Sequence, residues 1–195
     1  MELRLLFVSA IIVAADQISK LLVKGIPAIH LTGLLPGEKI PVIGNLFTLT
    51  LLENPGIAFG INFGPDFKLL LSIFTLAASI GLLIFFLKIR NKSFGLRLSI
   101  ALILGGAVGN LIDRVFYGIF YHYAPLFYGK VVDFFNLHLF NIYLFRSTVG
   151  DYVFNIADLA VTAGMISLLF TIRKSNKEKE ILGTSLENFL VKDKE

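Results

Sequence analysis

The sequence of 195 residues contains no cysteine, and only 16% of its residues are charged. Without cysteine the chain can form no disulfide bond, no thiol nucleophile and no thiolate metal site, which excludes several classes of enzyme. The scarcity of charge goes with 55% hydrophobic residues and a mean hydropathy of +0.77, which is not the composition of a soluble domain. A core of this size cannot enclose so much apolar material, so much of the chain is expected to face lipid.

Long apolar stretches are present instead. Four of them are long enough to cross a hydrocarbon core of about 30 Å. They predict transmembrane helices at Leu3–Val23, Phe67–Leu87, Leu96–Phe116 and Val153–Ile172. The first stretch could instead be a cleaved signal peptide, but Asp16, Gln17 and Lys20 interrupt it where an uncharged run should continue.

The basic residues give these spans a direction. Lysine and arginine are frequent between the second and third spans and after the fourth, but sparse in the two long connections, 24–66 and 117–152. Because cytoplasmic loops carry the excess of positive charge, we predict that both termini are cytoplasmic and the long connections extracytoplasmic. The formal net charge of +4 is therefore interpreted as a topology signal and not as a nucleic-acid-binding surface.

The outer connections have a pattern of their own. Lys39–Leu52 and Val131–Phe140 alternate and are rich in β-forming residues, with a turn expected at Gly44-Asn45. The predicted fold is thus an integral membrane protein, mainly α, with a small extracytoplasmic β element. Residues 1–174 are expected to form the membrane domain, and 175–195 a polar cytoplasmic tail with a short helix at Ile181–Val191.

Ionisable residues inside the spans collect in the outer half of the membrane. At about 1.5 Å per residue, Asp16, Asp113 and Asp158 lie about 20 to 26 Å from the inner ends of their helices. Asp133 and Asn54 belong to the two outer connections, so polar residues from five segments can meet at the outer face. Because charge inside a membrane is costly, this convergence predicts a functional site.

Two of these carboxylates have a cation close in sequence. Asp16 precedes Lys20 by four residues and Asp113 is adjacent to Arg114. For both pairs, a structural role as ion pairs that neutralise each other and hold helices together explains the residues as well as a functional role does.

Asp133 and Asp158 have no cation within one helical turn in sequence. If they meet in a partly desolvated site, their repulsion would raise one pKa and leave a pair that shares a proton. Such a pair can activate water and protonate a leaving amine, as in aspartic proteases. Spacing alone leaves open the alternative that each aspartate is a turn or capping residue.

Other chemistries find little support. The three histidines, His30, His122 and His138, lack the spacing of metal ligands. Ser19 and Lys20 cannot form a catalytic pair within one helix, because adjacent residues point about 100° apart. The glycines fall into two groups. Gly56 and Gly60 suit positive φ or close approach to a ligand, with an ordinary turn as the alternative. The glycines of the third span, Gly105, Gly106 and Gly109, suit tight helix packing.

Five short motifs occur in a fixed order along the chain: DQISK at 16–20, NPGIAFG at 54–60, GNLIDR at 109–114, VVDF at 131–134 and FNIAD at 154–158. In this order they resemble the lipoprotein signal peptidases, also called signal peptidase II, over all four spans. The resemblance implies an aspartyl endopeptidase of the bacterial cytoplasmic (inner) membrane that removes the signal peptide of a prolipoprotein just before its diacylglyceryl-modified cysteine. It implies no cofactor or metal, a lipid-modified prolipoprotein and membrane lipids as partners, no nucleic acid, and a monomer.

The resemblance also implies roles for individual residues. It places the catalytic aspartates at Asp133 and Asp158. Roles in binding substrate or organising the site map onto Asp16, Lys20, Asn54, Gly56, Asn110, Asp113, Arg114 and Asn155. The chain departs from the family pattern at Ile57, where a small alanine is usual, in a longer aromatic segment at 115–130 and in a longer tail.

Two other functions compete with this one. A small proton- or ion-coupled transporter subunit would use the charged residues as a relay, but the inner halves of the spans lack carboxylates apart from Glu2. A structural membrane subunit would leave the outer cluster of Asn and Asp unexplained.

Overall fold

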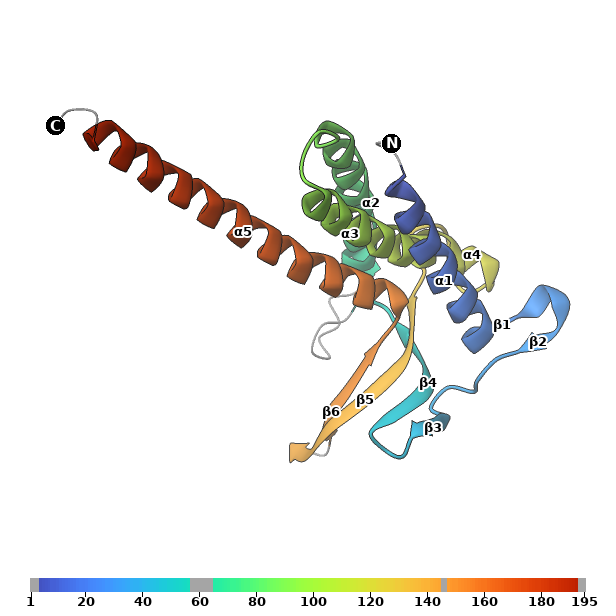
Figure 1. Ribbon diagram of the computed structural model, residues 1–195. Coiled ribbons are helices and arrows are strands. Elements are labelled where there is room, and N and C mark those ends of the chain that lie inside the picture. The colour runs from blue at the N-terminus through green and yellow to red at the C-terminus, as the bar shows by residue number, and fades with distance from the viewer. Residues whose placement is uncertain (1–3, 57–64, 145–146, 193–195) are drawn as a thin grey trace.

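The computed structural model describes residues 4–56, 65–144 and 147–192. Ile57 and Gly60, which the sequence analysis singled out, lie outside these ranges. Figure 1 shows a group of helices with a β-sheet projecting from one end, while the N-terminus and the turn between α2 and α3 lie at the other end.

The four predicted spans are confirmed as helices. They are α1 (Leu6–Lys24), α2 (Pro65–Lys88), α3 (Phe94–Ile112) and α5 (Ile156–Lys192), and each contains a stretch long and apolar enough to cross a membrane. The third span is longer than expected, because α3 continues through a π-helical turn, Asp113–Tyr117, into the short helix α4, Gly118–Phe120.

α3 lies at the centre of the bundle and packs against α1, α2 and α5. Its glycines allow this, as predicted from their spacing. A Cβ atom at Gly105 would come within 3.1 Å of the backbone of Ser9 on α1, and one at Gly106 would overlap the carbonyl oxygen of Ala157 on α5. Close backbone approach at small residues is a common way for membrane helices to associate.

The β element is a four-stranded antiparallel sheet in the order β3-β4-β5-β6. Its strands are β3 (Lys39–Ile43), β4 (Phe47–Asn54), β5 (Val131–Leu144) and β6 (Ser147–Phe154). A separate pair, β1 (Gly25–Ile26) and β2 (Leu31–Thr32), follows α1 and encloses a 3-10 turn at Pro27–Ile29. The two predicted strand segments and the turn between β3 and β4 are confirmed.

The predicted start of the fourth span was wrong. Val153 and Phe154 belong to β6, where they pair with Asn136 and Phe135 of β5, and the helix begins only at Ile156. Their side chains pack in the sheet, where the Phe154 ring lies 5.7 Å from that of Phe135. The position of Asn155 between the strand and the helix is important for the site below.

The tail also differs from the expectation. α5 continues without a break to Lys192, so the segment 181–191 is part of one long helix and not a separate short one. In Figure 1, α5 extends away from the sheet and well past the ends of the other helices.

The sheet is anchored to the helices by a small apolar core. Val132 and Phe134 of β5, Leu51 of β4 and Tyr117 are all buried there. Because Val132 and Phe134 flank Asp133 along the strand, this core fixes the part of β5 that carries Asp133 against the ends of α1 and α3.

Candidate active site

A fully buried ion cluster lies where α1 meets the end of α3. It consists of Asp16, Lys20 and Asp113, whose side chains are all 0% exposed. The Lys20 Nζ atom lies 2.7 Å from Oδ2 of Asp16 and 2.8 Å from Oδ2 of Asp113. The predicted tie between Asp16 and Lys20 is present, but Asp113 forms its ion pair with Lys20 and not with its neighbour Arg114.

Local geometry explains the ion cluster. Asp16 and Lys20 are four residues apart on α1 and therefore share a face. Gly109 of α3 makes room for them, because a Cβ atom there would lie 2.7 Å from Oδ2 of Asp16. The other Asp16 oxygen accepts a hydrogen bond from the backbone N–H of Ala157 at 3.0 Å, which ties α1 to the first turn of α5.

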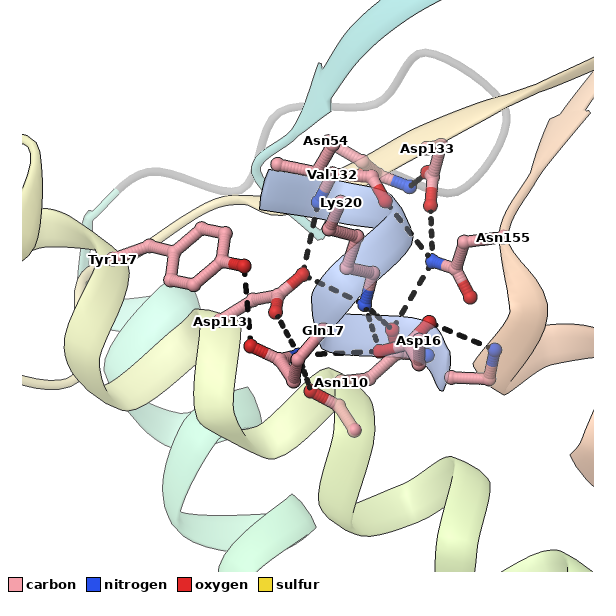
Figure 2. A network of polar contacts seen from close by, with 12 residues as sticks. Asp16, Gln17, Lys20, Asn54, Asn110, Asp113, Tyr117, Val132, Asp133 and Asn155 are labelled. Atoms are coloured by element: carbon pink, nitrogen blue, oxygen red, sulfur yellow. Dashed lines mark hydrogen bonds and ion pairs between the residues drawn. The ribbon is translucent and has the colours of Figure 1, made fainter. Parts of the chain in front are cut away.

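Two asparagine side chains, called here the amide bridge, connect the ion cluster to the outer carboxylates. Asn110 accepts from Lys20 Nζ at 2.9 Å and donates to Oδ1 of Asp158 at 2.9 Å. Asn155 donates to Oδ1 of Asp133 at 2.6 Å and to Oδ1 of Asn110 at 3.1 Å. In Figure 2 the Asn155 amide lies between Asp133 and the ion cluster, and its nitrogen points toward Asp133.

Asp133 and Asp158, the aspartate pair, are brought together by this bridge. Asp133 is 2% exposed and also accepts from Nδ2 of Asn54 at 3.2 Å. Asp158 is partly exposed and lies in the first turn of α5. Within the described residues, neither carboxylate forms an ion pair.

A reciprocal cap holds Asp158 in place. The backbone N–H of Asn155 donates to Oδ2 of Asp158 at 3.2 Å, and the backbone N–H of Asp158 donates to Oδ1 of Asn155 at 2.9 Å. This is the arrangement of a capping box, in which residues three apart satisfy each other's backbone donors at a helix start. Asn155 therefore positions both members of the aspartate pair.

The electrostatics of the aspartate pair suit a shared proton. Burial, together with the nearby negative charge of Asp158, raises the pKa of Asp133 to about 7, against the opposing hydrogen bonds from Asn54 and Asn155. One carboxyl group of the pair can therefore stay protonated near neutral pH.

Asn54 and Gly56 form a tight turn beside the pair. The backbone N–H of Gly56 donates to Oδ1 of Asn54 at 2.9 Å, and Gly56 has φ +91°. The predicted positive φ at Gly56 is confirmed, and the turn leaves the Asn54 amide directed at Asp133.

Arg114 lies close enough to Asp113, Asp133 and Asp158 for electrostatic interaction with all three. In the part of the chain that the structure describes, its buried Nε atom has no hydrogen-bond partner. Arg114 is thus a cation beside the aspartate pair whose donors are not fully used by the protein.

Sequence reasoning missed two residues of the network. The Nε2 atom of Gln17 donates to Asp113, Asp16 and the Gly109 carbonyl, and the Tyr117 hydroxyl donates to Oε1 of Gln17. Gln17 lies inside the first motif and Tyr117 follows Asp113 by four residues. These positions were the available signals, but neither residue carries a charge that would have drawn attention to it.

The aromatic segment 115–130 packs around Lys24 at the end of α1. The Lys24 Nζ atom lies 3.9 Å from the ring centroid of Tyr121 and 4.9 Å from that of Tyr123. Glu53 forms ion pairs with Lys24 and with Lys130, the latter at 3.0 Å. Beyond this contact, the segment exposes apolar side chains, namely Phe116, Ile119, Phe120 and Leu126.

No group of three or more His, Cys, Asp or Glu side chains within the described ranges is arranged to hold a metal ion. The expectation of a reaction without a cofactor remains a prediction.

Comparisons with known proteins agree with the family resemblance. The profile of the family described as Signal peptidase (SPase) II matches residues 8–174. A lipoprotein signal peptidase of Clostridium acetobutylicum is 39% identical over 142 residues, covering 72% of this chain and 80% of that protein. A lipoprotein signal peptidase of Pelodictyon phaeoclathratiforme is 36% identical over 177 residues, covering 90% of this chain and 93% of that protein.

The fold is similar to that of a bacterial membrane enzyme whose structure was solved by the in meso method. The two structures align with a TM-score of 0.63 and 26% sequence identity, over 90% of this chain and 91% of the other.

Proposed function

This chain belongs to the signal peptidase II family, the lipoprotein signal peptidases, which are aspartic peptidases, and on that premise we propose that Asp133 and Asp158 are its catalytic residues. The observation that carries the proposal is their arrangement. Two carboxylates from different segments share the amide bridge, and neither is neutralised by an ion pair among the described residues.

The pair activates water in one step and releases the amine in the next. The Asp158 carboxylate takes a proton from a water molecule as its oxygen bonds to the scissile carbonyl carbon, and Asp133 gives its proton to the carbonyl oxygen. When the tetrahedral intermediate collapses, the C–N bond breaks and the leaving nitrogen takes the proton held by Asp158. At the same time one hydroxyl of the intermediate returns a proton to Asp133 as the C=O bond re-forms. The products are a carboxylic acid on the signal peptide and a free amine on the lipoprotein.

The greater burial of Asp133 supports this division of roles. The raised pKa of Asp133, caused by burial and by the charge of Asp158, favours the proton on Asp133. Asp158 is the more exposed of the two and receives an N–H donor on each oxygen, from Asn110 and from the backbone of Asn155.

The substrate class follows from the family. We propose that the chain cleaves a diacylglyceryl-modified prolipoprotein just before the lipidated cysteine, at the extracytoplasmic end of the membrane. The sheet and the aspartate pair lie at the end of the bundle opposite the basic turn at 88–97, which supports a cytoplasmic position for that turn and for the N-terminus (Figure 1).

The surrounding residues have supporting roles in this proposal. Lys20 contacts both Asp16 and Asp113 and holds their side chains in place, while Asn155 and Asn110 orient the aspartate pair. Arg114 has an unused donor beside the pair and would bind a carbonyl oxygen of the substrate. Gly56 has φ +91° and lies against the Leu71 side chain, so a larger residue there would disturb the turn that directs the Asn54 amide at Asp133.

The transporter alternative finds no support in this geometry. A relay needs charged groups that reach both faces of the membrane, whereas the ion cluster is fully buried at one end of the bundle.

The test is a gel-shift cleavage assay in detergent with a diacylglyceryl-modified prolipoprotein, using the unmodified precursor and the Asp133→Asn variant as comparisons. We expect cleavage of the modified precursor alone, and loss of that cleavage in Asp133→Asn while the variant stays folded. Near-normal turnover by Asp133→Asn would remove Asp133 from the mechanism. No cleavage by folded wild-type protein would contradict the proposed substrate.

A further inference from the structure

Gln17 lies between a membrane-side groove and the ion cluster. The groove has a volume of about 620 Å³ and is formed by α1, α2 and α3, with Ala14, Leu76, Ser79 and Val108 among its lining residues. Gln17 is the lining residue of α1 nearest the sheet. One side of its side chain therefore meets an apolar space while the other meets buried charges.

The amide of Gln17 is fully used within the protein. Its Nε2 atom lies 2.8 Å from Oδ1 of Asp113, 3.0 Å from the Gly109 carbonyl oxygen and 3.2 Å from Oδ2 of Asp16. Its Oε1 atom accepts from the Tyr117 hydroxyl at 3.1 Å. Figure 2 shows this amide beside the Asp113 and Asp16 carboxylates, with the Tyr117 ring on the side away from Asp16.

These contacts lead to the strand that carries the aspartate pair. The other oxygen of Asp113, Oδ2, accepts from the backbone N–H of Val132 at 3.1 Å, and Val132 directly precedes Asp133. Tyr117 is 4% exposed and packs in the same core as Val132. The Asp113 carboxylate thus contacts the β5 backbone directly before Asp133.

We propose that Gln17, held by Tyr117, is a positioning residue that fixes the Asp113 carboxylate and through it the backbone next to Asp133. This inference rests on the proposed function, because it assigns Gln17 a role in turnover by the aspartate pair.

Glutamine has the properties that this position requires. The ion cluster combines two acidic side chains with one ammonium group, so acidic groups already outnumber cations there. An amide gives N–H donors to both carboxylates without adding charge, and its oxygen accepts the tyrosine proton. Leucine would fit the apolar groove but leave each carboxylate with one donor fewer, and glutamate would add a third acidic group facing Asp16, Lys20, Asp113 and Tyr117.

The experiment compares Gln17→Leu, Gln17→Glu and Tyr117→Phe with wild type by kcat, KM and pH profile on the lipidated prolipoprotein. We expect Gln17→Leu to lower kcat about tenfold to a hundredfold with KM within about twofold, because misplacement of a reacting group costs rate more than binding. Tyr117→Phe should lower kcat about threefold to tenfold. The activity of Gln17→Glu relative to wild type should fall as pH rises, because the introduced carboxyl group can donate a proton only in its neutral form.

Hydrogen exchange of the β5 amides near Val132 gives a readout that does not depend on turnover. Gln17→Leu should speed exchange of the Val132 amide, because the Asp113 acceptor becomes mobile. Ser79→Ala is the matched control: Ser79 lines the same groove, but among the described residues its hydroxyl bonds only within α2, to the Thr75 carbonyl at 2.8 Å. We expect its kcat and its exchange to match wild type.

The outcomes separate the two proposals. Unchanged kcat and unchanged Val132 exchange in Gln17→Leu would overturn the positioning role. A lack of cleavage by wild-type protein would count against the proposed function, while the exchange measurement would still decide whether Gln17 orders β5.

Discussion

The ion cluster of Asp16, Lys20 and Asp113 and the aspartate pair of Asp133 and Asp158 share one amide bridge, yet they balance negative charge in different ways. In the ion cluster, one ammonium group contacts both carboxylates and all three side chains are 0% exposed. In the aspartate pair, neutral amides donate to both carboxylates, Arg114 lies nearby without an ion pair among the described residues, and Asp158 stays partly exposed. The same residue type is thus paired with an ammonium group in one place and with neutral amides in the other, where the two carboxyl groups can share a proton.

The difference shows why the fold brings two carboxylate groups so close together. A buried carboxylate without a cation is costly, and a site that needs one is best built on a rigid support. The ion cluster supplies this support, because Asp16 holds the start of α5 and Asp113 holds β5 beside Asp133.

The largest expected effect on turnover comes from replacing one aspartate of the aspartate pair, compared with replacing one aspartate of the ion cluster. Asp158→Asn should lower kcat by at least about a thousandfold in a protein that still folds, because it removes the proposed base but keeps one of the two acceptor oxygens that hold this side chain. Asp16→Asn should destabilise the fold but leave the surviving folded protein able to cleave. Activity assays and thermal unfolding in detergent measure both.

The distinction between the ion cluster and the aspartate pair fails if the two variants lose turnover to the same extent. A well-folded Asp16→Asn protein with no turnover would mean that the ion cluster takes part in the chemistry.

The next largest effect concerns the cation. Lys20→Met leaves Asp16 and Asp113 buried without their shared partner, and breaking a buried ion pair from one side typically costs about 3 to 5 kcal/mol. We expect a matching loss in the free energy of unfolding, measured by denaturant titration in detergent. Lys88→Met, at the exposed end of α2, is the control and should change stability by less than about 0.5 kcal/mol.

How much of this arrangement the sequence predicts depends on how local each contact is. The pairing of Asp16 with Lys20 follows from a spacing of four on one helix, and the convergence of Asn54, Asp133 and Asp158 on one end follows from span length. The pairing of Lys20 with Asp113 could not be predicted, because it depends on how closely α1 approaches α3 at Gly109 and on the π-helical turn that begins at Asp113.

Two other features escaped for similar reasons. The end of β6 was assigned to the fourth span, because Val153 and Phe154 are as apolar as residues of a membrane helix and a short apolar run does not distinguish the two structures. The aromatic segment 115–130 was recognised only as a departure from the family pattern, because its packing around Lys24 depends on tertiary contacts alone.

A third effect follows from the raised pKa of Asp133. Its pKa is about 7 in the folded protein, through burial and the charge of Asp158, against 3.8 for a free aspartate. Stability from this group is therefore fully present below pH 3.8 and is lost as pH rises through 7. The loss can reach about 4 kcal/mol, from about 1.4 kcal/mol for each pKa unit.

Asp133→Asn removes this dependence and isolates it from other groups. We expect the variant to gain stability over wild type between pH 5 and pH 8, as measured by denaturant titration at both values. If the difference in stability between Asp133→Asn and wild type is the same at pH 5 and at pH 8, Asp133 titrates as an ordinary aspartate and the aspartate pair shares no proton.

The smallest effect is expected at Glu53, which shows what charge contributes when water reaches it. Glu53 is 30% exposed and pairs with Lys24 and Lys130. Burial alone would raise the pKa of Glu53, but the two ammonium groups hold it below its usual value, so its contribution is present above that value and is lost as pH falls. Solvent screens such pairs, and Glu53→Gln should cost less than about 1 kcal/mol at pH 7, with kcat unchanged. Unfolding measured at pH 7 and pH 4 checks this expectation: the loss of stability in Glu53→Gln should be smaller at pH 4.

A loss of stability similar to that of Lys20→Met would mean that the contacts around Lys24 support the site as strongly as the ion cluster does. Burial would then not be what separates the two groups of charges.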